Sequence, residues 1–135
     1  MGNSGATVGI VLVSHSGKLA EGLRELIGQL GSAGGRVFCA GGTDDGGIGT
    51  SYERIGAAIA EADTGAGVVV LPDIGSAVLT ARMVLEDDPR QDTVLVDAPF
   101  VEGAVAAAVT ASTGADLAAV TGAAREARTQ PKFQA

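Results

Sequence analysis

Four short apolar segments recur along the chain with helical segments between them, and this alternation limits the fold more than any other feature. The apolar segments cover residues 8–13, 36–40, 67–71 and 93–96. They are rich in valine and lack polar alternation, which is typical of strands covered on both faces. Strands that alternate with helices are joined by right-handed crossovers. We therefore predict an α/β fold with a single open, mainly parallel four-stranded sheet.

The segments between and after the strands carry apolar residues at helical spacing. We expect three helices with apolar stripes at Leu19, Leu23, Leu26, Ile27 and Leu30, at Tyr52, Ile55 and Ile59, and at Val78, Leu79, Met83 and Leu85. Thr50 and Glu53 have the spacing of a capping box at the start of the second helix. Two alanine-rich helices follow over 101–112 and 116–127, the latter with Asp116 as N-cap.

The order of the strands decides where a site forms. A central first strand gives the order 2-1-3-4, with helices on both faces and a topological switch point between strands one and three. Ligands bind at the carboxyl ends of the strands beside such a point. The two loops there cover residues 14–16 and 72–77. The only histidine, His15, and Asp73 should therefore meet across the crevice.

These residues suit a phosphohistidine site. A histidine nucleophile needs one free ring nitrogen, while an acceptor such as Asp73 holds the other nitrogen of His15. Gly75 and Ser76 begin the third helix, whose N-terminus favours a phosphate group. We predict a metal-free site in which Gly75, Ser76 and Ser16 bind phosphate. The alternative is that His15 only forms a hydrogen bond at a strand end and that Asp73 is a turn residue or an N-cap.

Other segments give weaker signals for a site. The glycine-rich residues 41–50 match neither the dinucleotide fingerprint nor the P-loop, so they are either a flexible loop or part of the site wall. Asp44 and Asp45 fit a solvated turn better than a cation site. Glu102 fits a carboxylate at a helix start. Cys39 lies in an apolar segment, and we expect it to be a small core residue.

Composition limits the partners. The 135 residues fit one domain, with a core of about 8–127 and flexible ends at 1–6 and 129–135. A net charge of -7 disfavours binding to nucleic acids or to anionic lipids. A single cysteine excludes an intramolecular disulfide. Because the sequence has neither a signal peptide nor a long apolar run, we expect a cytoplasmic protein without membrane insertion.

Four motifs in order resemble the mannose-family EIIA domains of the phosphoenolpyruvate-dependent phosphotransferase system. They extend from about residue 8 to residue 116, and the match is closest to the phosphoryl-donor subunits of dihydroxyacetone kinases. The motifs are Val8-Gly9-Ile10-Val11-Leu12-Val13-Ser14-His15-Ser16 with Leu19-Ala20-Glu21-Gly22, Gly41-Gly42-Thr43 with Ile48-Gly49-Thr50, Asp73-Ile74-Gly75-Ser76-Ala77, and Ala98-Pro99-Phe100-Val101-Glu102-Gly103-Ala104.

The resemblance implies that His15 is the phosphorylated residue and that Asp73 orients it. The phosphoryl-carrier protein HPr would phosphorylate His15, which would pass the group to ADP on the nucleotide-binding subunit of the kinase. ADP or ATP and Mg would then be bound by that partner, with no cofactor on this subunit. The resemblance also implies a homodimer. Two alternatives stay open: an EIIA component of sugar uptake and a noncatalytic regulatory or binding module.

Overall fold

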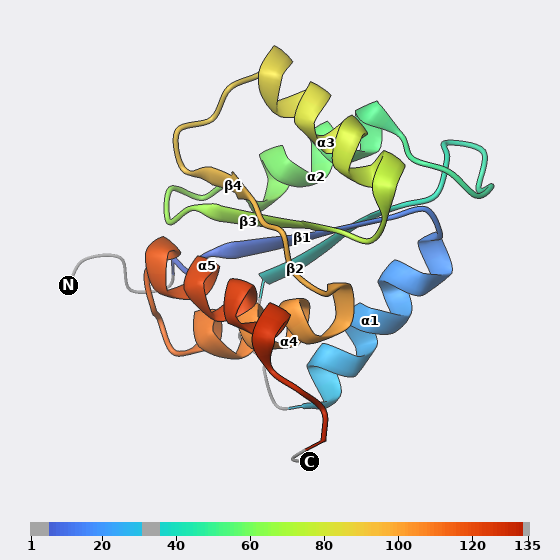
Figure 1. Cartoon of the computed structure of the whole chain (residues 1–135). Coiled ribbons are helices and arrows are strands. Elements are labelled where there is room, and N and C mark those ends of the chain that lie inside the picture. The colour runs from blue at the N-terminus through green and yellow to red at the C-terminus, as the bar shows by residue number, and fades with distance from the viewer. Residues whose placement is uncertain (1–5, 31–35, 134–135) are drawn as a thin grey trace.

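The central sheet has the predicted strand order. The computed structural model of the chain describes residues 6–30 and 36–133 (Figure 1). Its four parallel strands stand in the order β2-β1-β3-β4. They are β1 (Gly9–Ser14), β2 (Arg36–Gly41), β3 (Val68–Pro72) and β4 (Thr93–Leu95). The α/β class and the order 2-1-3-4 are confirmed.

Helices cover both faces of the sheet (Figure 1). They are α1 (Gly17–Gln29), α2 (Tyr52–Ala62), α3 (Gly75–Asp87), α4 (Phe100–Ser112) and α5 (Leu117–Glu126), and a short 3-10 turn, η1 (Ala127–Thr129), follows. The helices α2 and α3 pack on one face, whereas α1, α4 and α5 pack on the other. No helix in the described part of the chain is long and apolar enough to cross a membrane.

The core consists of two apolar layers, one on each side of the sheet. Alternate residues of β1 enter the two layers: Ile10 and Leu12 face α1, α4 and α5, whereas Val11 and Val13 face α2 and α3. All four side chains are fully buried. Each such burial contributes about 1.5–3 kcal/mol relative to exposure. The strands are therefore apolar without alternation because both faces are covered.

The predicted apolar stripes of α1 and α3 are partly wrong. Leu19 and Leu26 of α1 and its C-cap Leu30 are exposed, as are Leu79 and Met83 of α3. The residues that α1 and α3 bury include small ones, and the full sets are Ala20, Leu23 and Ile27 in α1, and Ala77, Ala81 and Val84 in α3. Alanine allows a helix to approach the sheet closely, so the buried face does not coincide with the largest side chains.

The predicted capping box at Thr50 is also wrong. Ser51 is the N-cap of α2, because its hydroxyl accepts a hydrogen bond from the Arg54 amide at 3.1 Å and donates one to Asp44 at 2.7 Å. The Thr50 hydroxyl contacts Thr80 instead. By contrast, Asp116 caps α5 as predicted.

Part of the predicted flexible ends lies outside the described residues, namely 1–5 and 134–135. In the described tail, the Lys132 ammonium donates to Glu102 in the first turn of α4. The hydrogen bond from Lys132 lowers the pKa of Glu102. Glu102 therefore lies at a helix start, as its position predicted, and its partner is the C-terminal tail.

Candidate active site

His15 and Asp73 follow the two central strands of the sheet, at the predicted switch point. His15 comes directly after β1 and Asp73 directly after β3. The Asp73 amide donates to the Val13 carbonyl at 2.9 Å, so the backbone pairing of β1 with β3 continues up to the site. The topology thus brings together two residues that are 58 positions apart.

The ring of His15 has one partner at each nitrogen. Nδ1 lies 2.9 Å from Asp73 Oδ1, and Nε2 lies 2.5 Å from Ser76 Oγ. An ionised carboxylate only accepts hydrogen bonds, so the proton of the neutral ring is on Nδ1. The lone pair of Nε2 then accepts from the Ser76 hydroxyl. Nε2 is therefore the nitrogen with nucleophilic capacity.

The Asp73 carboxylate accepts four hydrogen bonds. Oδ1 accepts from the His15 ring at 2.9 Å and from the Ile74 amide at 2.6 Å. Oδ2 accepts from the Ser14 hydroxyl at 2.9 Å and from the His15 amide at 3.0 Å. Partial burial raises the pKa of Asp73, but these hydrogen bonds, chiefly those from His15, outweigh it and lower the pKa below its usual value. Asp73 is therefore ionised at neutral pH.

The N-terminus of α3 faces Nε2 of His15. Its N-cap is Ile74, which makes no side-chain cap bond, so the alternative of Asp73 as the N-cap is wrong. Gly75 and Ser76 are exposed, and a Cβ atom at Gly75 would meet nothing within 4 Å. The first amide groups of a helix lack partners within it and attract anions. Phosphate binding by Gly75 and Ser76 stays a prediction that this open geometry permits.

Ser16 directly follows His15 and is the N-cap of α1. Its hydroxyl accepts from the Leu19 amide at 3.1 Å and caps the helix. Its own amide donates to Ser14 Oγ at 3.0 Å. The hydrogen of the Ser16 hydroxyl is not used in the cap, so phosphate binding by Ser16 also stays a prediction.

The glycine-rich loop 41–50 packs against the site. Its Gly42 amide donates to the Ser14 carbonyl at 3.0 Å, and its Gly49 amide donates to the His15 carbonyl at 2.8 Å. Gly42 has a φ of 76°, and a Cβ atom there would lie 2.8 Å from the Gly47 carbonyl. Glycine is needed here because the turn is left-handed and tightly packed. Of the two alternatives for this segment, the structure favours a wall of the site.

A chain of hydroxyl groups joins the same loop to α3. The Thr80 hydroxyl donates to the Ser76 carbonyl at 2.9 Å. Its single hydrogen is thereby used, so the Thr50 hydroxyl is the donor in the 2.9 Å contact between Thr50 and Thr80. The loop therefore contacts both residues that meet at Nε2: it binds the backbone of His15 and the helical turn that carries Ser76.

The acidic residues of the loop hold its shape. Asp44 accepts from the Ser51 hydroxyl and pairs with Arg54 at 3.4 Å. Asp45 accepts from the Thr43 hydroxyl and from a loop amide, and the hydrogen bond from Thr43 lowers the pKa of Asp45. In residues 6–30 and 36–133, no three His, Cys, Asp or Glu side chains are grouped as metal ligands. The partners of Asp45 lie within the predicted turn, whereas Asp44 joins that turn to the start of α2.

Cys39 is half-buried in β2 and packs against the core. Burial raises the pKa of its thiol to about 11. The thiol is therefore protonated at neutral pH, and a thiolate is needed for nucleophilic chemistry. This agrees with its prediction as a small core residue.

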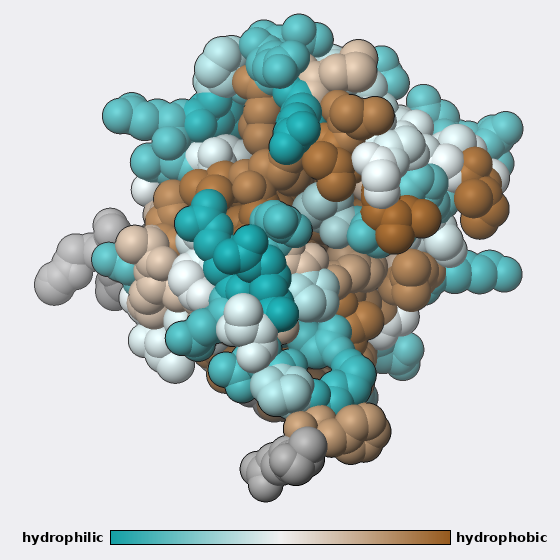
Figure 2. Space-filling view, viewed as in Figure 1, coloured by the Kyte–Doolittle hydropathy of each residue, from teal (hydrophilic) through white to brown (hydrophobic). Residues whose placement is uncertain are grey.

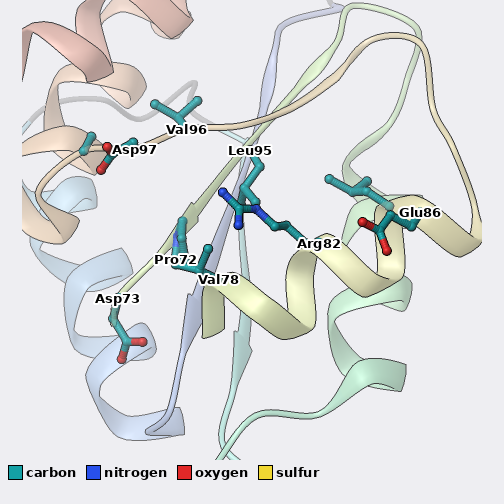
Figure 3. Close-up of a pocket in the computed structure, with 10 residues that line it drawn as sticks. Pro72, Asp73, Val78, Arg82, Glu86, Leu95, Val96 and Asp97 are labelled. Atoms are coloured by element: carbon teal, nitrogen blue, oxygen red, sulfur yellow. The ribbon is translucent and has the colours of Figure 1, made fainter. Parts of the chain in front are cut away.

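A cavity of about 660 Å³ opens beside Asp73 (Figure 3). It lies between α3, the end of β3 and the segment that follows β4. Its walls combine the charged residues Asp73, Arg82, Glu86 and Asp97 with apolar ones; the apolar lining residues are Pro72, Val78, Leu85, Leu95, Val96 and Ala98. The space-filling view has a broad apolar area over α3 and β4 (Figure 2). His15 does not line this cavity, so the cavity is connected to the His15 ring through Asp73.

Residues 9–121 match the EIIA-man family, described as the PTS system fructose IIA component. The chain belongs to this family. It is 41% identical over 105 residues to phosphoryl donor subunit DhaM of PEP-dependent dihydroxyacetone kinase 2 from Listeria innocua, covering 76% of this chain and 84% of that protein. It is 34% identical over 114 residues to phosphotransferase subunit DhaM of the PTS-dependent dihydroxyacetone kinase from Lactococcus lactis, covering 84% and 90%.

A longer relative and a solved structure agree with this assignment. The DhaM protein of the Escherichia coli PEP-dependent dihydroxyacetone kinase is 40% identical over 116 residues, which are 82% of this chain but only 25% of that protein. A crystal structure of a protein of unknown function matches with a TM-score of 0.84 at 33% identity, covering 95% of this chain and 99% of that one. The resemblance to the phosphoryl-donor subunits is confirmed.

Proposed function

We propose that this chain is the phosphoryl-donor subunit of a dihydroxyacetone kinase and that it carries the phosphoryl group on Nε2 of His15. One observation carries the proposal: Nδ1 of His15 faces the Asp73 carboxylate, whose pKa is lowered, while Nε2 faces Ser76 at the N-terminus of α3. The names of the DhaM relatives support the substrate class. HPr is the proposed donor, and ADP on the nucleotide-binding kinase subunit is the proposed acceptor.

In the first half-reaction, the lone pair of Nε2 attacks phosphorus while the bond between phosphorus and the ring nitrogen of phospho-HPr breaks. Nδ1 keeps its proton, so the phosphorylated ring of His15 is cationic and Asp73 compensates the charge. The Ser76 hydroxyl leaves Nε2 and turns to the phosphoryl oxygens, which also face the amide groups of Gly75 and Ser76. This chain therefore supplies position and charge compensation, which is most of what phosphoryl transfer requires.

In the second half-reaction, a β-phosphate oxygen of ADP attacks the same phosphorus and the bond to Nε2 breaks. The ring returns to the neutral form with its proton on Nδ1, and ATP forms on the partner subunit. ADP and Mg belong to that partner, so we place no cofactor on this chain. Because two partners use one nitrogen in turn, the mechanism is ping-pong with a covalent intermediate. Phosphoenolpyruvate and ADP are intracellular, so this role implies the cytoplasm.

We also propose a homodimer, but on a different surface from the one that composition suggested. The alanine-rich α4 buries Ala104, Ala107 and Ala111 fully within the chain, and the apolar residues that it exposes are Val101 and Val109. The helix α3 exposes larger apolar side chains, those of Leu79 and Met83, and exposes more of each. Within the described residues, the neighbouring strand β4 pairs on one side only. A second copy on α3 and the edge of β4 would cover both features.

The two rival functions differ in their partners and in their chemistry. An EIIA component of sugar uptake would use the same histidine, but would discharge to a transporter-associated domain. A noncatalytic module would not need the fixed tautomer at His15. The deciding experiment incubates the protein with phosphoenolpyruvate, enzyme I and HPr, and then adds the kinase subunits loaded with ADP. We expect intact-protein mass spectrometry to detect one phosphoryl group that the loaded kinase removes; no phosphorylation would refute the proposal.

A further inference from the structure

We propose that Ser14 is a positioning residue for the reaction at His15, because its buried hydroxyl fixes the Asp73 carboxylate. This inference rests on the proposed phosphoryl transfer. Ser14 is the last residue of β1, pairs with Gly41 of β2 and is 0% exposed. It is a polar residue at the end of an otherwise apolar strand. Such a position needs partners for its hydroxyl inside the protein.

The direction of the hydrogen bond follows from the two neighbours of the hydroxyl. Ser14 Oγ lies 3.0 Å from the Ser16 amide, which is only a donor, so Oγ accepts there. The hydrogen of the hydroxyl is therefore free for Asp73 Oδ2, at 2.9 Å. Both contacts are made at once, and each of them uses a different capacity of the same oxygen.

This contact decides which way the carboxylate faces. Asp73 Oδ2 has two donors, the Ser14 hydroxyl and the His15 amide, and with both in place the other oxygen points to the His15 ring. Removing the hydroxyl leaves Oδ2 with one donor and leaves the Ser16 amide without its acceptor. Because Ser14 is fully buried, water does not replace the lost group. The carboxylate then gains freedom to rotate, and the proton on Nδ1 is held less firmly.

The contact from Ser14 persists through the reaction, unlike the contact from Ser76. The Ser76 hydroxyl leaves Nε2 when the phosphoryl group arrives, so it does not orient the ring in the phosphorylated state. Ser14 is behind the carboxylate and touches neither the ring nor the phosphoryl group. It therefore holds Asp73 in place while the ring of His15 becomes cationic and neutral again.

The alternative is that Ser14 only ties the end of β1 to the start of α1 through the Ser16 amide. In that case Ser14→Ala lowers stability without acting on His15 through Asp73. The two explanations differ in coupling, because residues that act through one another have non-additive effects. A double-mutant cycle of Ser14 and Asp73 separates them.

The experiment measures the initial rate of His15 phosphorylation with fixed enzyme I, HPr and phosphoenolpyruvate. We expect Ser14→Ala to be about 10-fold slower than the wild type, and Ser14→Thr, which keeps the hydroxyl, to stay within about 2-fold. In the Asp73→Asn background, Ser14→Ala should add less than about 2-fold. Thr121→Val is the matched control: it removes another buried hydroxyl, one that has no partner among the described residues, and should leave the rate unchanged.

A second measurement needs no partner protein. In ¹⁵N NMR spectra of the unphosphorylated protein, we expect the His15 ring of the wild type to be in the Nδ1–H tautomer, and that of Ser14→Ala to be a mixture of tautomers. If the wild type accepts no phosphate, the proposed function fails, whereas the tautomer still reports on Ser14. If Ser14→Ala does not fold, Ser14→Cys, with a weaker donor, should give an intermediate mixture. A wild-type tautomer in the variant that folds, or a rate loss that multiplies with Asp73→Asn, would overturn the role.

Discussion

The carboxyl ends of β1 and β3 and the outer edge of β4 belong to the same sheet but are built differently. At β1 and β3, each polar atom of His15 and Asp73 that bears on the chemistry has a named partner within 3.0 Å. At β4, an open cavity with both apolar and charged walls lies beside exposed apolar residues of α3. Directional hydrogen bonds suit the orientation of reacting groups, whereas open apolar surface suits association with another protein. The proposed chemistry and the proposed assembly therefore use different parts of one sheet.

The strongest test of this separation removes the nucleophile. His15→Ala should fold normally and accept no phosphoryl group, because no other side chain at the site has a comparable nitrogen. The wild-type adduct should be labile to acid and stable to alkali, as expected for phosphohistidine. Mass spectrometry before and after acid treatment provides the measurement. An acid-stable phosphate on the alanine variant would point to Ser14, Ser16 or Ser76 instead.

The next largest effect should come from the group that orients His15. Asp73→Asn keeps the shape of the side chain but removes the charge that holds the proton on Nδ1. We expect phosphorylation to slow by roughly 10- to 100-fold, as for other residues that orient a reactive histidine. Rates with HPr in excess give the comparison. Asp97→Asn is a suitable control, since Asp97 also follows a strand but is exposed and lies 3.6 Å from Arg128, not beside His15. Equal rates for the two variants would contradict the role of Asp73.

Asp73 should also make stability depend on pH. Its pKa is lowered in the folded state, so its ionised form contributes stability above the unfolded pKa of about 3.9. That contribution should be lost as the pH falls through the lower folded pKa. The difference in unfolding free energy between the wild type and Asp73→Asn should therefore be largest near neutral pH and shrink below about pH 4. Urea unfolding at several pH values measures it, and a pH-independent difference would contradict the lowered pKa.

The sequence was most informative where a simple physical rule acted on large side chains. The parallel sheet followed from alternation of apolar segments with helices, and the order 2-1-3-4 from placing the first strand at the centre. The contact between His15 and Asp73 followed from the position of the switch point. The helix faces were harder, because buried alanines such as Ala77 and Ala81 carry little weight in an apolar stripe. Packing distance, which the sequence does not contain, decides which face is buried.

Other parts of the site depended on distances that no motif specifies. From the sequence, Ser14 was placed only in the motif around His15 and was given no role of its own. A signal for such a role was present, because Ser14 is a polar residue at the end of an apolar strand. The free ring nitrogen of His15 could be assigned only once both of its neighbours were placed. The contact of Gly49 with the His15 carbonyl involves backbone alone, so side-chain patterns gave no indication of it.

Substitutions on the apolar surface of α3 should change the phosphorylation rate little but should change the oligomeric state directly. Leu79→Glu with Met83→Glu places charges on exposed positions, so the fold should be kept. In light scattering, we expect the mass to fall from about twice 13.3 kDa to 13.3 kDa, with phosphorylation within about 3-fold of the wild type. Leu26→Glu, at an exposed position of α1, is the control and should remain dimeric. A wild type that is monomeric at micromolar concentration would refute the dimer.

The smallest effect should come from the loop 41–50, which contacts both the backbone of His15 and the turn of α3 that carries Ser76. Thr50→Val keeps the shape of the side chain but removes the hydroxyl that donates to Thr80, which in turn donates to the Ser76 carbonyl. One hydrogen bond of this kind contributes about 0.5–1.5 kcal/mol, so we expect a modest loss in the free energy of unfolding. Phosphorylation should slow by about 2-fold, because Ser76 is then held by α3 alone. Ser112→Ala, which removes a hydroxyl at the end of α4, should leave the rate unchanged. If Thr50→Val slows the reaction as much as Asp73→Asn does, the loop takes a direct part in the chemistry and the site extends beyond the two strand ends.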